Sequence, residues 1–339
     1  MPLADTVRIA TLGAGRIGAN HAEIVARRVP GASLVAVSDP MDGAAQRLAT
    51  ELGAPLATMD VHEVLTSDDV DAVLITAPAR SHTDLVVAAA AAGKHIFCEK
   101  PMAVTLADAD RAVAAADDAG VVLQVGFNRR FAPGFAAARL AIDAGKVGTP
   151  QLLRSLTRDP GPYAGDPART PQWTIFLETL IHDFDTLCFL NPGAAPVRVT
   201  AVADALIRPD AKAAGHLDTA VVTVVFDNGA IATADASFSA LYGYDVRGEV
   251  FGSAGMVTAG HGNSTDMTYY GSAGIEIDTA RMDTDLLRSG YIGELTAFVD
   301  AVRFGTPPVV TGHDARTALS IALAAIASVE TGTAVEVSA

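Results

Sequence analysis

Residues 7–18 read Val-Arg-Ile-Ala-Thr-Leu-Gly-Ala-Gly-Arg-Ile-Gly. The first six are an apolar, β-prone run, and the last six match the pattern GxGxxG, with a helix-like segment after it. In this order Gly13 permits a tight turn, Gly15 lets the backbone approach a pyrophosphate, and Gly18 lets the helix pack closely on the strand. The helix N-terminus then offers N–H groups and partial positive charge to the phosphates. The stretch predicts a dinucleotide-binding unit.

A second apolar run, residues 33–38, ends at Asp39, about 20 residues after the last glycine. A carboxylate at this position accepts a hydrogen bond from a ribose 2′-hydroxyl and repels a 2′-phosphate. The next residues, Pro40, Met41 and Asp42, include no arginine that would neutralise such a phosphate. The sequence therefore predicts NAD rather than NADP as the cofactor. The alternative is an ordinary βαβ turn with incidental glycines.

Length and composition bound the class of protein. The chain has 339 residues, of which 50% are hydrophobic and 19% charged, with a formal net charge of −15. This length suits two domains, and this composition is that of a globular protein. The negative charge argues against nucleic-acid and anionic-membrane partners, because both require clustered Lys and Arg. No leader-like segment precedes the first strand and no apolar run reaches the roughly 18 residues of a membrane span, so we expect a cytoplasmic protein.

Strand and helix signals alternate over the first 125 or so residues. Short apolar strands separated by helices predict a parallel sheet buried on both faces, and right-handed crossovers make it doubly wound. We therefore expect an α/β Rossmann domain at residues 1–126. The expected strands are 7–12, 33–38, 72–76, 95–98 and 121–125, and the expected helices are 17–28, 43–52, 82–92 and 106–119.

From residue 127 the pattern changes to one helix, one strand, a Pro/Gly-rich loop and then a series of strands. Strands kept apart from helices predict an α+β domain with a large open, mainly antiparallel sheet, here a substrate-binding and oligomerisation domain at residues 127–339. The loop at 159–171 is long enough to be a functional lid. The expected helices are 133–144, 176–190, 291–303 and 314–329, and the expected strands are 151–158 and several between 197 and 277.

Polar residues follow the predicted parallel strands at their carboxyl ends, where a doubly wound sheet binds its ligand. Glu99, Lys100 and Pro101 follow the strand at 95–98. Proline restricts the turn and directs the lysine before it, so Lys100 is a candidate for steadying a developing alkoxide. The alternative is a surface Lys–Glu pair.

A nicotinamide cofactor implies hydride transfer, and oxidation of an alcohol also needs a base that titrates near neutrality. His182 lies four residues after Glu178 on the predicted helix 176–190, so the two share a face and the carboxylate fixes the imidazole tautomer. Asp185 lies one further turn along that face. A metal site built from these three residues, or a solvated helix face, remains an alternative.

These segments together resemble the Gfo/Idh/MocA family of sugar and cyclitol oxidoreductases. The resemblance covers nearly the whole chain, and residues 126–131 and 181–185 are most similar to its inositol 2-dehydrogenase branch. The segments that carry it are the glycine triplet at 13–18, Glu-Lys-Pro at 99–101, and the stretches 124–131, 178–185 and 242–247.

The resemblance implies a catalytic pair of Lys100 and His182, with Glu178 holding the histidine. The family commonly has Asp four residues before this histidine, so Glu178 keeps the charge one methylene further out. Where the family often carries Thr-Pro-Asn after its third strand, this chain has Ala79 at the Asn position. The expected cofactor-binding residues are Gly13, Gly15, Arg16, Ile17, Gly18, Asp39, Ala77, His82, Glu99 and Lys100. The expected substrate-binding residues are Lys100, Asn128, Arg129, Arg158, Glu178, His182, Tyr242 and Tyr244.

The resemblance further implies NAD-dependent oxidation of a ring hydroxyl of a cyclitol, myo-inositol or scyllo-inositol, to the keto-inositol. His182 is the general base, Lys100 stabilises the alkoxide, and no metal is expected. It also implies a homotetramer, because family members pair open sheets between subunits. The alternatives are the same chemistry on a pyranose or anhydrosugar of the glucose or levoglucosan type, a non-catalytic NAD-binding sensor, and the metal-dependent enzyme.

Overall fold

The computed structural model describes residues 6–161, 170–260 and 262–338. Packing divides the chain into two compact units. Unit 1 comprises Met1–Asn128 and Ser289–Arg316, and unit 2 comprises Arg129–Arg288 and Thr317–Ala339.

Unit 1 is built on a parallel sheet which, in the described part of the chain, has six strands in the order β3-β2-β1-β4-β5-β6. The chain order reverses between β1 and β4, which is the switch point where such sheets bind ligands. The predicted Rossmann fold is confirmed, and the short edge strand β3 is an addition to it. The strands are β1 (Val7–Leu12), β2 (Ala32–Ser38), β3 (Leu56–Thr58), β4 (Ala72–Ile75), β5 (His95–Cys98) and β6 (Leu123–Val125).

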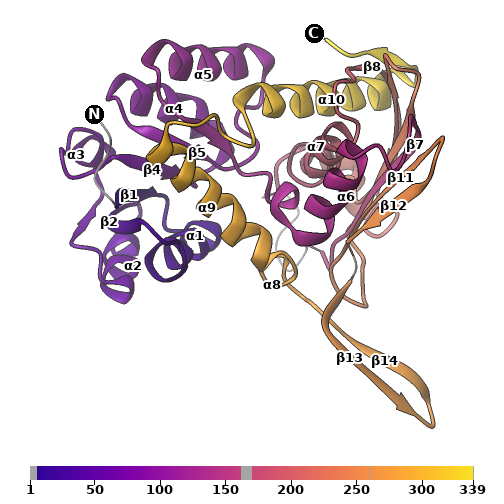
Figure 1. Cartoon of the computed structure of the whole chain (residues 1–339), viewed down its shortest axis with the longest axis horizontal. Coiled ribbons are helices and arrows are strands. Elements are labelled where there is room, and N and C mark those ends of the chain that lie inside the picture. The colour runs from indigo at the N-terminus through magenta and orange to yellow at the C-terminus, as the bar shows by residue number, and fades with distance from the viewer. Residues whose placement is uncertain (1–5, 162–169, 261, 339) are drawn as a thin grey trace. The chain divides into compact units, whose positions relative to one another are not determined.

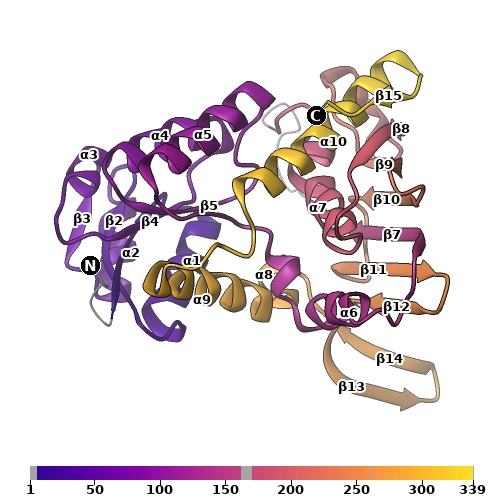
Figure 2. The ribbon, with the colours of Figure 1, turned by 45° about the horizontal axis from the view of Figure 1, so that its top comes forward.

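Helices cover both faces of this sheet, with α4 and α5 on one face and α1, α2 and α9 on the other (Figures 1 and 2). This double cover explains why the strands read as continuous apolar runs. Thr105 caps α5 by accepting from the Asp108 N–H, and Gly120 ends that helix in the left-handed conformation. The helices are α1 (Arg16–Arg28), α2 (Ala44–Leu52), α3 (Val61–Leu65), η1 (Ala79–Ser81), α4 (His82–Ala91), α5 (Leu106–Ala119) and α9 (Arg288–Phe304).

Helix α9 packs in unit 1 although it follows the first segment of unit 2, Arg129–Arg288, in the sequence. The Phe298 ring lies 5.9 Å from that of Phe97 on β5, and the Gln124 side-chain amide donates to the Glu294 carbonyl at 2.7 Å. A boundary at residue 127 alone does not describe this packing, because the apolar face of α9 is buried against the first sheet. As a division between cofactor and substrate functions, the boundary remains a prediction.

Unit 2 is built on a mixed sheet with the described order β12-β11-β7-β10-β9-β8-β15. Its strands pair antiparallel except β7 with β10, which confirms the predicted, mainly antiparallel sheet. A separate hairpin, β13–β14, projects away from it (Figures 1 and 2). The strands are β7 (Pro150–Arg158), β8 (Pro196–Asp204), β9 (Thr219–Phe226), β10 (Ile231–Ser237), β11 (Asp245–Gly252), β12 (Met256–Ala259), β13 (Asn263–Gly271), β14 (Gly274–Thr279) and β15 (Val335–Glu336).

The helix predicted at 176–190 is two consecutive elements, the π-helix η4 (Ile175–Leu180) and the α-helix α7 (Ile181–Phe189). Both contact the sheet of unit 2 through β10, and α7 also contacts β7. The predicted lid at 159–171 falls largely on residues 162–169, outside the described residues. The remaining helices are η2 (Asn128–Phe131), α6 (Pro133–Asp143), η5 (Pro209–Ala214), α8 (Asp283–Leu286) and α10 (Gly312–Thr331).

Within the described ranges, no helix combines the length and apolar character that crossing a bilayer requires.

Replacing Phe298 by alanine should lower the free energy of unfolding by about 3–5 kcal/mol, because the truncation leaves a cavity between α9 and β5. Urea denaturation measures this change. Phe304, at the end of the same helix, is 66% exposed and provides the matched control. Phe304→Ala should change stability by no more than about 0.5 kcal/mol. Equal losses in the two variants would contradict the packing assigned to α9.

Candidate active site

A pocket of about 670 Å³ lies in unit 1 at the carboxyl ends of β1, β2 and β4. Its wall combines the glycine-rich turn and the Asp39 carboxylate with apolar side chains that suit a flat aromatic base. The predicted residues Gly13, Gly15, Arg16, Ile17, Asp39 and Ala77 line it, together with Leu12, Ser38, Pro40, Met41, Met59, Val61, Thr76, Pro78, Ser81 and Leu85.

The three glycines meet different surroundings. A Cβ on Gly18 would lie 2.0 Å from the Gly13 carbonyl oxygen, and a Cβ on Gly13, whose φ is +113°, would lie 2.8 Å from the Thr76 backbone. A Cβ on Gly15 would meet nothing within 4 Å among the described atoms. Gly13 and Gly18 therefore allow close packing, whereas Gly15 keeps the pocket open beside the N-terminus of α1. This cradle fits a dinucleotide pyrophosphate.

Asp39 is fixed beside this turn by the backbone. Its carboxylate accepts hydrogen bonds from the N–H of Ala14 at 2.7 Å and of Met41 at 2.8 Å. A carboxylate has about four lone-pair sites, so acceptor capacity remains for a ribose hydroxyl. The arrangement fits NAD, because it presents an anion where NADP would place a phosphate.

His82 is buried, and its ring faces backbone rather than the pocket. Its Nε2 lies 2.6 Å from the Ala77 carbonyl oxygen, and its Nδ1 lies 2.8 Å from that of Pro101. The imidazole thus bridges the loop after β4 and the turn after β5. The cofactor contact predicted for His82 stays a prediction.

Glu99 and Lys100 follow β5 directly. Glu99 is buried, and its Oε2 accepts from the Lys100 backbone N–H at 3.0 Å, while its Oε1 lies 2.7 Å from His21 Nε2. Burial opposes the ionisation of Glu99, but the hydrogen bond to His21 and the Lys100 charge outweigh it and lower the pKa of Glu99. The half-buried Lys100 side chain is therefore carried on a backbone that a buried carboxylate holds.

In unit 2 the predicted base lies at the junction of two helix types. Glu178 is exposed on the π-helix η4, and His182 is half-buried in the first turn of α7. Residues four apart lie near one face in a π-turn as in an α-turn, so the predicted pairing of Glu178 with His182 stays a prediction. Single π-helical turns occur frequently at functional sites.

The Asp183 carboxylate organises a buried network that sequence reasoning did not identify. It accepts from Arg129 Nη1 at 2.8 Å, Ser155 Oγ at 2.5 Å and Thr157 Oγ1 at 2.7 Å. Arg129 also donates to Thr157 Oγ1 at 2.6 Å and is only 4% exposed. The substrate contact predicted for Arg129 remains a prediction. In the structure this guanidinium ties η2 to β7 and α7.

Asp185 is bound by another arginine. Arg130 donates to it through Nε at 3.1 and 3.0 Å and through Nη2 at 2.6 Å, and both side chains are buried. A bidentate guanidinium occupies the oxygens that a metal would need. The alternative metal site of Glu178, His182 and Asp185 is therefore not supported.

The other predicted substrate residues of unit 2 have carboxylate partners. Arg158 pairs with Asp235, the Tyr242 hydroxyl donates to Asp245 at 2.9 Å, and the Tyr244 hydroxyl donates to Asp159 at 2.6 Å. Burial, and then the charge of Asp159, raise the pKa of Tyr244 well above its usual value. Tyr244 therefore stays a neutral donor at physiological pH.

The structure gathers the predicted residues into two groups, one in each unit. The cofactor group, Lys100 and the buried Asn128 belong to unit 1. Ten pocket-lining residues were not among the predicted cofactor-binding residues, since single residues at strand and helix ends carry no motif; they are Leu12, Ser38, Pro40, Met41, Met59, Val61, Thr76, Pro78, Ser81 and Leu85. The group in unit 2 consists of Arg129, Arg158, Glu178, His182, Tyr242 and Tyr244.

Comparison with known proteins identifies the family. A profile described as "Oxidoreductase family, NAD-binding Rossmann fold" matches residues 7–127, and one described as "GFO/IDH/MocA C-terminal domain" matches residues 135–258. The chain belongs to the GFO/IDH/MocA family. The family resemblance expected from the motifs is thereby confirmed over most of the chain.

Similar members of the GFO/IDH/MocA family are inositol dehydrogenases. The myo-inositol 2-dehydrogenase of Thermotoga maritima is 38% identical over 325 residues, 96% of each chain. The scyllo-inositol 2-dehydrogenase (NAD(+)) of Bacillus subtilis is 37% identical over 332 residues, covering 97% of this chain and 96% of its own. The scyllo-inositol dehydrogenase of Lactobacillus casei, solved with NAD(H) and scyllo-inositol, is 26% identical with a TM-score of 0.94, covering 98% of this chain and 100% of its own.

Substitution of the two helix glycines should separate binding from stability. Gly15→Ala places a methyl group in open pocket space, so it should weaken NAD binding by about tenfold, or about 1.4 kcal/mol, with little change in Tm. Gly18→Ala forces a methyl group against backbone, so it should lower Tm. Titration calorimetry and thermal unfolding measure the two effects. Unchanged NAD affinity in Gly15→Ala would contradict the assigned role of the pocket.

Proposed function

We propose that the protein is an NAD-dependent inositol dehydrogenase, which oxidises a ring hydroxyl of myo-inositol or scyllo-inositol to the keto-inositol. The observation that carries this proposal is the near full-length match, at a TM-score of 0.94, to a dehydrogenase holding NAD(H) and scyllo-inositol. Sequence identities of 38% and 37% to myo- and scyllo-inositol 2-dehydrogenases support it. The glycine cradle and the Asp39 anion described above fit the cofactor.

In this reaction the cofactor-binding residues and the catalytic residues have separate roles. The backbone of residues 13–18 holds the pyrophosphate and Asp39 holds the adenosine ribose. Bound NAD supplies the hydride acceptor. His182 removes the proton from the ring hydroxyl, with the Glu178 carboxylate supporting its basicity. The Lys100 ammonium donates a hydrogen bond to the same oxygen and stabilises its developing negative charge.

Lys100→Ala and His182→Ala should each reduce kcat by about 10²–10⁴-fold while NAD binding persists, because each removes one proton-transfer or charge-stabilising group. NADH formation from NAD with myo-, scyllo- and chiro-inositol, glucose, xylose and levoglucosan measures turnover, and a parallel set uses NADP. Lys146→Ala, at an exposed lysine, is the control.

The same assay distinguishes the proposed inositol dehydrogenase from the alternative functions. Near-normal turnover in either variant would refute the role assigned to that residue. Turnover only on a pyranose or anhydrosugar would keep the mechanism and replace the substrate. No turnover with NAD still bound would favour an NAD-binding sensor.

We also propose that the open face of the unit 2 sheet pairs with the same face of another subunit, as in a homotetramer. Strand register places four apolar side chains in one row across β12, β11, β7 and β10. Met256, Phe251, Leu152 and Ile231 are 55%, 45%, 55% and 46% exposed, respectively. Contiguous exposed apolar surface on a sheet favours association with a second subunit.

The variant Leu152→Asp/Ile231→Asp should reduce the molar mass measured by light scattering after size-exclusion chromatography, because it buries charge in the proposed interface. Leu140→Asp, on α6 at 70% exposure, is the control and should leave the mass unchanged. An unaltered mass in the double variant would refute the proposed interface.

A further inference from the structure

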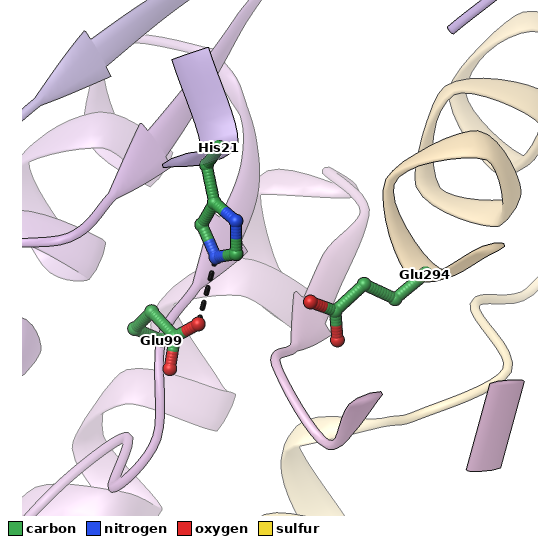
Figure 3. A group of neighbouring side chains, drawn as sticks. All are labelled: His21, Glu99 and Glu294. Carbon is green, nitrogen blue, oxygen red and sulfur yellow. Dashed lines mark hydrogen bonds and ion pairs between the residues drawn. The ribbon is translucent and has the colours of Figure 1, made fainter. Parts of the chain in front are cut away.

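Three titratable side chains meet in the interior of unit 1. His21 comes from α1, Glu99 from the end of β5 and Glu294 from α9, and their ligand atoms all lie within 4.8 Å of one another. Figure 3 shows the His21 ring and the Glu294 carboxyl group both directed toward Glu99. All three side chains are buried, so charge here is not screened by solvent.

The surroundings of the cluster are aromatic. The His21 ring lies 5.3 Å from the Phe97 ring, edge to face, and 5.6 Å from that of Tyr291. Space is tight as well, since a Cβ on Gly126 would lie 3.1 Å from Glu99 Oε1. A second negative charge in such a pocket is costly unless a donor compensates it.

The two carboxyl groups are not equivalent. Glu99 receives the Lys100 N–H and contacts His21, whereas both carboxyl oxygens of Glu294 lack a hydrogen-bond partner among the described residues. Two carboxylates at this separation favour protonation of one of them. The proton belongs on Glu294, which has no donor to stabilise an anion.

His21 fits the same assignment. Its Nδ1 has no partner in the described part of the chain, whereas its Nε2 lies 2.7 Å from Glu99 Oε1 and donates to that carboxylate. Glu99 is therefore the carboxylate of the cluster that receives hydrogen-bond donors. Lys100 is the cation next to it.

A metal ion fits this geometry less well than a proton. His21 Nε2 and Glu99 Oε1 are 2.7 Å apart, a hydrogen-bond distance. Two ligands of one tetrahedral ion, with bonds of about 2.1 Å, lie about 3.4 Å apart.

We propose that Glu99 is a positioning residue that fixes the backbone of Lys100, and that Glu294 remains a neutral acid so that Glu99 alone carries the negative charge of the cluster. The assignment for catalysis rests on the proposed function, in which Lys100 touches the reacting oxygen. Glu99 acts through Lys100, and Glu294 acts through Glu99.

Glu294→Gln tests the protonation state, because the amide resembles the neutral acid. Burial, and then Glu99, raise the pKa of Glu294 well above its usual 4.5. The native fold must keep a proton that the unfolded chain releases above this pH, so its stability falls as pH rises. The Tm of Glu294→Gln should therefore exceed that of the native protein by a margin that grows above pH 4.5 and vanishes below it.

Glu99→Gln tests the positioning role. It replaces a charged acceptor by a neutral one, so kcat should fall by about tenfold or more, with a much smaller change in KM for inositol. Glu294→Gln should keep kcat within about twofold of native and extend activity to higher pH, since the group that ionises there is removed. The titratable groups involved are His21, Glu99, Lys100 and Glu294, with the Cys98 thiol beside Glu99.

Two measurements do not depend on activity. The native-minus-Glu294→Gln infrared difference spectrum at neutral pH should contain the carbonyl stretch of a protonated carboxylic acid. Amide hydrogen exchange at Lys100 should accelerate in Glu99→Gln and stay unchanged in Glu294→Gln. If the native protein oxidises no inositol, the proposed function fails, and these two readouts still decide the cluster.

Absence of the acid carbonyl band, or a loss of kcat in Glu294→Gln as large as in Glu99→Gln, would refute the neutral acid. A stoichiometric metal in the purified native protein, lost in both variants, would replace the proton by a cation. Unaltered Lys100 exchange in Glu99→Gln would refute the positioning role.

Discussion

The cofactor pocket depends on one close backbone contact, that between Gly18 on α1 and Gly13 in the turn after β1. Helix α1 can lie against the turn after β1 only because residue 18 carries no side chain, and the Thr76 hydroxyl ties the end of β4 to the Leu12 and Gly13 carbonyls at 3.2 and 2.9 Å. The wall facing the pyrophosphate is consequently main chain. This wall requires glycines, which have no side chain, and it requires no particular side chain from other residues. A short glycine pattern therefore identifies it.

The sequence predicts the first sheet well because each strand is buried on both faces and reads as an apolar run. β1 and β5 have the predicted bounds, as does α5. β3 was missed because it is a three-residue strand. The placement of α9 was missed because a long-range contact, such as that of Phe298 with Phe97, leaves no trace in local periodicity. The π-helix η4 likewise has no pattern distinct from that of an α-helix.

The residues of the candidate site could be predicted from the sequence, but most of the contacts between them could not. Motifs and the family resemblance pointed to Lys100 and His182 by their place after a strand and on a helix. They did not reveal that Asp183 would collect Arg129, Ser155 and Thr157, since Arg129 and Asp183 are 54 residues apart. Partners of buried charges are chosen by the fold, because an unpaired buried charge is costly. Sequence proximity carries no such information.

The discontinuity of unit 1 has a consequence for how the protein is made. Its closing helix, α9, leaves the ribosome only after residues 129–288 have been synthesised. Until then the nascent sheet lacks the cover that Phe298 provides and His21 and Glu99 lack their third neighbour, so apolar and ionisable groups stay open to water and to chaperones. Unit 2 is discontinuous as well, because it includes Thr317–Ala339. The cofactor pocket, although lined by residues from 12 to 85, rests on a unit that is completed only when α9 has been synthesised.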